Sequence, residues 1–358
     1  MLYRETGQFK STYVQDQAIF PIRQDRWAVA LIALVAFVAV PLLANEYWLQ
    51  AVLIPFVIFS LAAIGLNLLT GYAGQLSLGT GAFMAVGAYA TFKITTAFPG
   101  LDLAVIFILA GVAAAGVGLV FGLPSLRIKG FYLAVATLAA QFFLTWMFNR
   151  VPWFYNYNSS GTITAPPRRM LGILVSGAGA PAPVRYLAAL SFLALLALAA
   201  KNLVRGRIGR NWMAVRDMDV AAEVIGIRMA RTKLLAFAIS SFYCGIAGAM
   251  MVFLWLGSAE TLAFDIDVSF QVLFMVIIGG LGSILGSILG AAFITLVPIL
   301  LTNLPRLAGL DIATDVSKNL EYVIFGGLIV FFLIAEPLGL ARLWHTFKDK
   351  LRLWPFPY

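Results

Sequence analysis

The sequence is dominated by apolar runs of about twenty residues, the length that an α-helix needs to cross the roughly 30 Å hydrocarbon core of a bilayer. Hydrophobic residues make up 61% of the 358 positions and charged residues 11%, whereas soluble domains carry roughly 25% charged residues. The chain has too little charge to cover a water-facing surface. It therefore predicts an all-α fold, a polytopic transmembrane helix bundle of about ten spans: 27–43, 48–70, 76–98, 103–123, 130–149, 184–201, 234–256, 268–284, 286–304 and 320–337.

The distribution of Lys and Arg predicts the orientation of these spans. The cations gather before residue 27, at Arg127 and Lys129, between 201 and 233, and after 341. With an even number of spans all four groups fall on one side, which the positive-inside rule makes the cytoplasmic side. We therefore expect both termini to be cytoplasmic, with this organisation: a tail at 1–26, a transmembrane domain at 27–337 with a cytoplasmic loop at 202–233, and a tail at 338–358.

One loop does not fit this charge distribution. The segment 150–183 must be external by span parity, yet it carries Arg150, Arg168 and Arg169. The net charge of +9 does not indicate nucleic-acid binding either, because the cations lie in gaps between apolar runs and not on one face. Membrane lipid is the expected surrounding, and no nucleic acid is expected as a partner.

Two glycine-rich places are typical of interrupted helices, at 70–81 and at 279–290. Irregular backbone at membrane depth survives only where it is buried in protein or lines a wet cavity, where its free N–H and C=O groups are available to a polar solute. The alternative is a pair of tight turns between helices. Residues at or near these places, with two glutamines, are candidates for lining a transport pathway: Asn67, Thr70, Gly74, Ser77, Gln141, Gln271, Gly279 and Gly280. Each polar side chain has a plainer alternative, a hydrogen bond between helices.

Several kinds of chemistry are missing from the sequence. There is no Gly-Lys dipeptide and hence no Walker A phosphate loop, so the chain is not itself an ATPase. The only histidine, His345, and the only cysteine, Cys244, cannot form a catalytic triad, a metal cluster or an internal disulfide, so we expect neither a catalytic nor a metal site. No Asp or Glu lies in the middle of a predicted span, which disfavours a proton relay. The energy source is expected to lie outside this chain.

The loop 202–233 contains a helical pattern. Val215, Met218, Ala222 and Ile225 recur at helical spacing, Arg216, Asp219 and Glu223 occupy a different face, and Gly226 is a stop signal. This predicts a short helix over 212–226 that lies in a groove of another protein. A solvated basic loop with incidental helicity is the alternative.

Here the chain resembles a known family. Ala221-Ala222, three residues and then Gly226 match the later part of Glu-Ala-Ala-x-x-x-Gly, the coupling-loop motif of ABC importer permeases, with Val220 in place of the glutamate. The subfamily that fits best is the branched-chain amino acid permeases, which resemble the chain beyond residue 45. The supporting stretches are 65–74, 77–83, 130–134, 221–227, 233–237 and 279–283. Residues 158–166 follow the family pattern loosely, and the tail at 1–26 has no clear counterpart.

The resemblance implies a permease subunit in the bacterial inner membrane that moves branched-chain or related hydrophobic amino acids by alternating access. Its partners would be a second permease subunit, two cytoplasmic ATP-binding subunits and a periplasmic solute-binding protein. The chain itself would bind no cofactor, and the partner subunits would use ATP and magnesium. By carry-over, ATPase coupling falls to Ala221, Ala222, Glu223 and Gly226, with Arg216 and Asp217 beside the contact.

Three alternatives remain open from the residues alone. A permease of a urea or short-amide ABC importer shares the same architecture. An ion-coupled secondary transporter would need no partner, although the missing carboxylate within the spans speaks against it. A membrane scaffold fits the composition but not the coupling-loop pattern.

Overall fold

The computed structural model describes residues 11–12, 23–127, 130–177, 179–307, 323–324, 326–328, 330–331, 334 and 339–353. Within these residues seven helical stretches are long and apolar enough to cross a membrane: Arg26–Leu43, Trp48–Tyr72, Leu103–Leu126, Phe131–Arg150, Ala182–Arg205, Met229–Leu256 and Thr261–Gly279. The predicted helical bundle is confirmed. The predicted count of ten spans is not, and its last span, 320–337, lies largely outside the described residues, as does most of the tail 1–26.

Most neighbouring helices from α2 to α13 are joined by short connections, whereas α7 and α8 are separated by residues 151–181. Their bounds are α2 Arg23–Leu34, α3 Val40–Leu43, α4 Ile54–Asn67, α5 Thr80–Ala97, α6 Leu103–Gly122, α7 Phe131–Arg150, α8 Ala182–Arg205, α9 Arg207–Asp217, α10 Asp219–Val224, α11 Met229–Met250, α12 Ile266–Gly279, α13 Ile284–Leu307 and α15 Gly339–Leu353. Stretches of π-helix extend several of them: Val35–Ala39, Trp48–Leu53, Leu68–Tyr72 and Met251–Leu256. The short strands are β1 Ile163–Thr164, β2 Arg168–Met170, β3 Ile173–Ser176 and β4 Ser258–Ala259.

Local sequence explains where two of the helices begin. The carboxylate of Asp102 accepts a hydrogen bond from the Ala104 N–H at 2.9 Å, at the start of α6. Asp265 does the same for the Ile266 N–H at 2.7 Å, at the start of α12. A side-chain oxygen at this position satisfies one of the helix N–H groups that have no partner within the helix. Both helices therefore start one residue after an aspartate.

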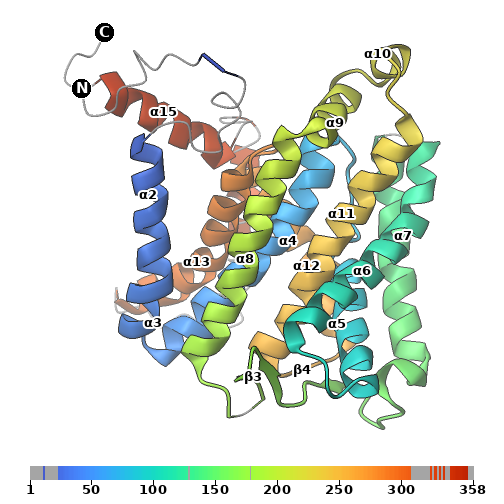
Figure 1. Cartoon of the computed structure of the whole chain (residues 1–358), viewed down its shortest axis with the longest axis vertical. Helices are drawn as coiled ribbons and strands as arrows, with labels where there is room; N and C mark the ends of the chain where they lie inside the picture. Colours follow the sequence, from blue (N-terminus) through green and yellow to red (C-terminus); the bar gives the residue numbers. More distant parts are fainter. Residues whose placement is uncertain are drawn as a thin grey trace.

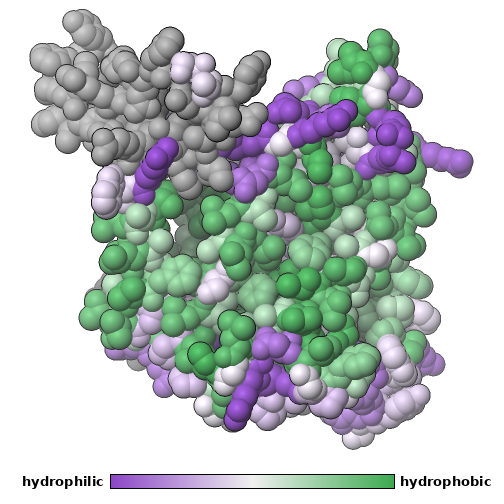
Figure 2. Space-filling model, in the orientation of Figure 1, coloured by the Kyte–Doolittle hydropathy of each residue, from purple (hydrophilic) through white to green (hydrophobic). Residues whose placement is uncertain are grey.

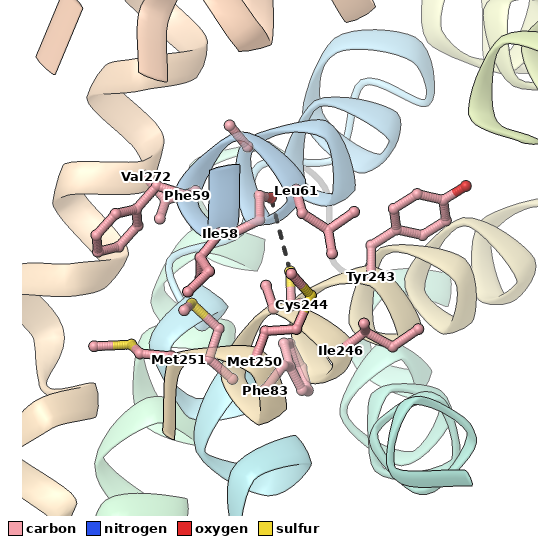
Figure 3. Packing of buried hydrophobic residues seen from close by; sticks show 14 of the residues in the cluster. Ile58, Phe59, Leu61, Phe83, Tyr243, Cys244, Ile246, Met250, Met251 and Val272 are labelled. Atoms are coloured by element: carbon pink, nitrogen blue, oxygen red, sulfur yellow. Dashed lines mark hydrogen bonds between the residues drawn. The ribbon is translucent and has the colours of Figure 1, made fainter. Parts of the chain in front are cut away.

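The centre of the bundle is formed by α4 and α11. Of the most apolar part of each span, 89% is buried for Trp48–Tyr72 and 83% for Met229–Leu256, against 0% for Arg26–Leu43. Figure 3 shows side chains of α4 and α11 packed together around Cys244, with Met250 and Met251 nearby. Large apolar side chains of the outer helices are exposed on the molecule, such as Leu42 and Leu195. In a bilayer these faces would meet lipid chains.

Small residues let the central helices approach closely. A Cβ atom placed on Gly87 of α5 would lie 1.9 Å from the backbone oxygen of Gly245 in α11. No side chain fits into that space, so glycine is required for the contact. Close backbone approach of this kind is how helices associate in lipid, where no hydrophobic force drives them together.

The two ends of the bundle differ in what they carry. In Figure 1, α9, α10, α15 and the start of α2 lie at one end, whereas β3 and β4 lie at the other. Figure 2 shows an apolar band between two more polar ends. The structure therefore groups the start of the first span, the loop 202–233 and the C-terminal helix at one end, as the charge distribution predicted. That this end faces the cytoplasm stays a prediction.

The structure explains one of the three arginines in the segment 150–183, which the charge distribution did not account for. The Arg168 guanidinium donates hydrogen bonds to the backbone oxygen of Thr95, at 2.6 Å, and to that of Pro99. Thr95 lies in the last turn of α5, where carbonyl groups lack helical partners and a positive charge is favoured. Arg168 is thus a cap on a helix end, while Arg150 and Arg169 are exposed.

Candidate functional site

The loop between α8 and α11 folds into two short helices. The predicted single helix over 212–226 is wrong, because the chain is extended at Met218 (φ −157°, ψ 95°), which ends α9 and begins α10. Trp212 anchors the first of them: its ring is fully buried, and its Nε1–H donates to the backbone oxygen of Thr232 at 3.0 Å. This anchor fixes α9 against the start of α11 and leaves α10 projecting from the end of the bundle (Figure 1).

The faces of α10 differ from the predicted ones. Ala222 is only 2% exposed and lies on the protein side of the helix, whereas Ala221 and Glu223 are exposed. The grouping of Ala222 with Met218 and Ile225 on one docking face is therefore wrong, because the bend at Met218 changes the register of the helix. The large apolar side chains that face outward are 66% to 82% exposed: Met218, Val220, Val224 and Ile225. We call these four residues the apolar cap of α10; Figure 2 shows apolar surface at this upper corner.

Gly226 ends α10 as predicted. Its φ of +89° lies in the left-handed region that favours glycine. The Ile227 N–H bonds the Ala222 oxygen at 3.0 Å and the Gly226 N–H bonds the Glu223 oxygen at 2.9 Å, which is the Schellman arrangement that closes a helix. The motif Ala-Ala-x-x-x-Gly thus encodes one buried contact residue and one helix stop.

Arg216 and Asp217 connect this loop to the helix bundle. Arg216 pairs with Asp217 at 2.9 Å, and its Nη1 donates to the backbone oxygen of Gly71 at 2.9 Å. The stem of Arg216 lies over Gly74, where a Cβ atom would be 2.7 Å from the Arg216 Cγ. Gly71 and Gly74 belong to the first predicted helix interruption. Arg216 therefore reaches back from the loop 202–233 into that interruption.

The two glycine-rich places predicted as interruptions meet in the structure, but they differ in kind. After the π-helical stretch Leu68–Tyr72 the chain is non-helical from 73 to 79, with Ala73, Gln75 and Ser77 buried. The second interruption, at 280–283, is a tight turn between α12 and α13. The first predicted place is thus a buried irregular segment, and the second is the simple turn that was the alternative.

Asn67 joins the two interruptions. Its Nδ2 lies 2.8 Å from the backbone oxygen of Ser283, 2.7 Å from the Ser287 hydroxyl and 3.4 Å from the Gly280 oxygen. Its Oδ1 accepts from the Gly282 N–H at 2.8 Å. We call these contacts the Asn67 clamp. Every polar atom of the Asn67 amide is used within the protein, so in this structure its role is the interhelical hydrogen bonding that was the alternative to pathway lining.

Gln141 forms a second clamp deeper in the bundle. Its Oε1 accepts from the Ala82 N–H at 2.6 Å and from the Ser269 hydroxyl at 3.1 Å, and its Nε2 donates to the Phe264 oxygen at 2.8 Å. Ser269 also accepts from the Gly81 N–H at 2.8 Å. These bonds, the Gln141 clamp, hold the first turn of α5 against the first turn of α12 and satisfy N–H groups that have no helical partner.

The other candidate pathway residues are not drawn into one site. Thr70 donates to the Gln75 oxygen at 3.3 Å, and the Ser77 hydroxyl accepts from the Gly79 N–H at 3.4 Å. Gln271 is half-buried on α12. Gly279 packs against Gly286 of α13, where a Cβ atom placed on Gly279 would lie 2.1 Å from the Gly286 backbone oxygen. The sequence analysis missed Ser269 and Ser287, because a single serine in an apolar run carries no signal until its partner across the bundle is known.

The described part of the chain offers no site for a metal ion. No group of three or more His, Cys, Asp or Glu side chains in it is placed to hold one. The described residues instead form a series of contacts. The projecting helix α10 follows α9, Arg216 of α9 bonds Gly71 in the first glycine-rich segment, and Asn67 bonds the turn between α12 and α13.

Comparison with known proteins gives a consistent result. The profile of the family described as "Branched-chain amino acid transport system / permease component" matches residues 48–333. The chain is 28% identical over 339 residues to the high-affinity branched-chain amino acid transport system permease protein LivM of Escherichia coli, covering 89% of this chain and 75% of that protein. It is 24% identical over 332 residues to the probable branched-chain amino acid transport permease protein LivM of Methanocaldococcus jannaschii, covering 82% of this chain and 92% of that one.

A further relative is the probable ABC transporter permease protein y4mJ of Sinorhizobium fredii, 28% identical over 257 residues, covering 68% of this chain and 69% of that protein. No solved structure is significantly similar. Since the family profile covers most of the sequence, the residues that carry the resemblance are part of a match along the whole bundle. The chain belongs to the family of permease components of branched-chain amino acid transport systems.

Proposed function

We propose that this chain is the membrane-spanning permease subunit of an ATP-driven ABC importer in the bacterial inner membrane. It carries branched-chain or related hydrophobic amino acids inward by alternating access. Its partners are a second permease subunit, two cytoplasmic ATP-binding subunits and a periplasmic solute-binding protein. ATP and magnesium are bound by the ATP-binding subunits. The names of the relatives from E. coli and M. jannaschii support the substrate class.

The observation that carries the proposal is the apolar cap of α10. Four large apolar side chains stand exposed on α10 and the two residues that flank it, at the basic end of the bundle. Such a helix is suited to a groove on another protein, where burial of apolar surface is favourable by roughly 25 cal/mol per Å². An ATP-binding subunit is the partner that the family provides at this position.

The hydrogen bonds from Arg216 give the docked helix a route into the bundle. A shift of α10 carries α9 with it, and Arg216 transmits the shift to Gly71. Gly71 lies against the Asn67 clamp: a Cβ atom there would be 1.9 Å from the Asn67 Oδ1 and 2.3 Å from the Gly282 nitrogen. The two segments would therefore move together, and both lack regular helical bonds, at 73–79 and at 280–283.

The decisive experiment replaces one residue of the apolar cap. Val224 is 82% exposed, so Val224→Asp is expected to leave the fold intact and to remove both co-purification of the ATP-binding subunit and uptake of leucine. Val224→Ala is the matched control that shortens the side chain without adding charge. Normal uptake with Val224→Asp, at an unchanged amount of permease in the membrane, would contradict the docking role.

The buried Ala222 gives a contrasting variant. Ala222→Glu is also expected to abolish uptake, but through a different cause, because a carboxylate at a 2% exposed position must displace α10 from its own chain. Protease sensitivity of the loop separates the two variants: Ala222→Glu should raise it, whereas Val224→Asp should not.

Substrate and energy source are tested in proteoliposomes that contain the complete complex. Uptake of labelled leucine supports the proposal, whereas uptake of labelled urea in its place would assign the chain to a urea or short-amide importer. Transport by this chain alone, driven by an ion gradient without ATP, would replace the proposal with a secondary transporter.

A further inference from the structure

The C-terminal helix α15 has a surface that transport by the bundle does not explain. Leu340, Leu343, Trp344 and Phe347 recur at helical spacing and form one stripe along the helix. The last three of these side chains are 44% to 54% exposed, and the rings of Trp344 and Phe347 lie 6.0 Å apart. Exposed aromatic groups of this size in one stripe indicate a surface that something covers.

The contacts at the start of α15 show where this helix lies along the axis of the bundle. Gly339 has a φ of +65°, and a Cβ atom there would lie 2.6 Å from the Ile278 oxygen and 2.7 Å from the Gly280 nitrogen. Ile278 and Gly280 mark the end of α12, so α15 begins where a membrane span ends. Figure 1 shows the helix crossing obliquely at that end of the bundle. The stripe is therefore at the level of the bilayer surface.

The charged residues beside the stripe indicate which kind of partner, protein or lipid, covers it. At about 100° per residue, Lys348 and Lys350 fall on opposite edges of the stripe, whereas Arg342, His345 and Asp349 lie away from it. Lysine is depleted in protein interfaces, but it is typical of helices that lie in the plane of a membrane, where its long stem follows the apolar face and its ammonium group reaches the headgroups. The apolar cap of α10 projects away from the bundle and is suited to a protein partner; the stripe of α15 is suited to lipid.

We propose that α15 is an interfacial helix that binds the anionic phospholipid surface. Leu343, Trp344 and Phe347 insert at the boundary between headgroups and acyl chains, and Lys348 and Lys350 bind phosphate groups. The start of α15 packs against Gly280, which belongs to the Asn67 clamp. Binding of α15 to the lipid surface would therefore also hold the turn between α12 and α13 at a constant position relative to the membrane. This inference does not depend on the ATP-driven mechanism or on the substrate.

The test places a spin label on each face of α15 in the full-length chain. In a Cys244→Ala background, Phe347→Cys marks the stripe and His345→Cys marks the opposite face. The chain is reconstituted in lipid nanodiscs of phosphatidylcholine and phosphatidylglycerol at a ratio of three to one. We expect the label at 347 to collide mainly with oxygen and the label at 345 mainly with a water-soluble nickel chelate.

A charge comparison tests the headgroup contact. Lys348→Glu with Lys350→Glu should lower the ratio of membrane-inserted to water-exposed label at 347, by about fivefold or more for each lysine. Arg207→Glu with Arg231→Glu, which makes the same change of net charge at exposed positions of the loop 202–233, should leave it unchanged. Replacing phosphatidylglycerol with phosphatidylcholine should act like the lysine variants.

Three outcomes would overturn the proposal. Equal access of the nickel chelate to positions 345 and 347 would place the stripe in water. Protection of 347 that appears only after the ATP-binding subunit is added would assign the stripe to a protein partner. Identical behaviour in the two lipid mixtures would remove the headgroup contact. Gel filtration of each variant shows whether the chain is still folded, and the label at 345 serves as an internal reference.

Discussion

Asn67 and Gln141 are both buried amides that tie an interrupted segment to a distant helix, yet they differ in what lies beyond them. The Asn67 clamp lies beside Gly71, whose oxygen accepts a bond from Arg216 in the loop 202–233, named the docking loop below after its proposed role. The Gln141 clamp is enclosed by α5, α7 and α12 and bonds only within the bundle. On the proposed function, the Asn67 clamp would be the joint that moves with the loop and the Gln141 clamp the joint that stays fixed. The difference between the two clamps is that only the Asn67 clamp lies beside a residue, Gly71, that is bonded to the loop 202–233.

The largest effect is expected from Gly71→Ala at the Asn67 clamp. The added Cβ atom would lie 1.9 Å from the Asn67 Oδ1 and 2.3 Å from the Gly282 nitrogen, so the clamp must open. The cost is about 2–4 kcal/mol, from overpacking and the lost hydrogen bonds. Thermal unfolding of the purified chain in detergent measures it.

Gly116→Ala is the matched control for this variant. Gly116 is exposed on α6, and a Cβ atom there would meet nothing within 4 Å. Alanine is the better helix former, so this change should leave stability unchanged or raise it by up to about 1 kcal/mol. Equal unfolding temperatures for the two variants would mean that the Asn67 clamp contributes nothing.

A smaller effect is expected from Gln141→Leu. This change leaves the Ala82 N–H and the Phe264 oxygen buried without their partner, at a cost of about 1–3 kcal/mol. The half-buried Gln271, exchanged for leucine in the same way, should cost much less. Because the Gln141 clamp has no bond to the docking loop, the protein that still folds should couple ATP hydrolysis to uptake normally. A variant that is stable but uncoupled would make the Gln141 clamp part of the moving mechanism.

The smallest effect on stability, with a large effect on transport, is expected from Arg216→Ala. The side chain is 39% exposed and loses one bond to Gly71, so the cost is about 0.5 kcal/mol. Uptake driven by ATP should nevertheless fall roughly tenfold, because the route from α10 to Gly71 is cut.

Asp217→Asn separates the two contacts of Arg216. It weakens the exposed ion pair and keeps the bond from Arg216 to Gly71, so uptake should stay near normal. If Asp217→Asn lowers uptake as much as Arg216→Ala, the ion pair and not the Gly71 bond transmits the movement.

Much of the bundle could be predicted from the sequence, because hydrophobicity over twenty residues is a local property. The spans containing α4, α6, α7, α8 and α11 lie within a few residues of their predicted positions. The span at 76–98 was predicted too long, since its first residues form the buried irregular segment before Thr80. Its polar and glycine residues pointed to an interruption but did not say where the helix resumes.

The candidate site was harder to predict. The stop at Gly226 followed from the sequence, because a left-handed residue after a helix is a local requirement. The faces of α10 did not, because periodicity assumes an unbroken helix and the extended backbone at Met218 breaks it. The partners of Asn67 lie more than 200 positions away in the sequence, and no pattern within one span can indicate them.

The sequence by itself determined that this chain is a helical membrane protein, where most of its long apolar helices lie, and to which family its motifs point, because these follow from composition, local periodicity and short motifs. Only the tertiary structure decided that the two interruptions meet at Asn67, that Arg216 reaches them from the docking loop, and that Ala222 faces inward. These contacts join segments far apart in the chain, and they depend on how the helices pack, which no single segment encodes.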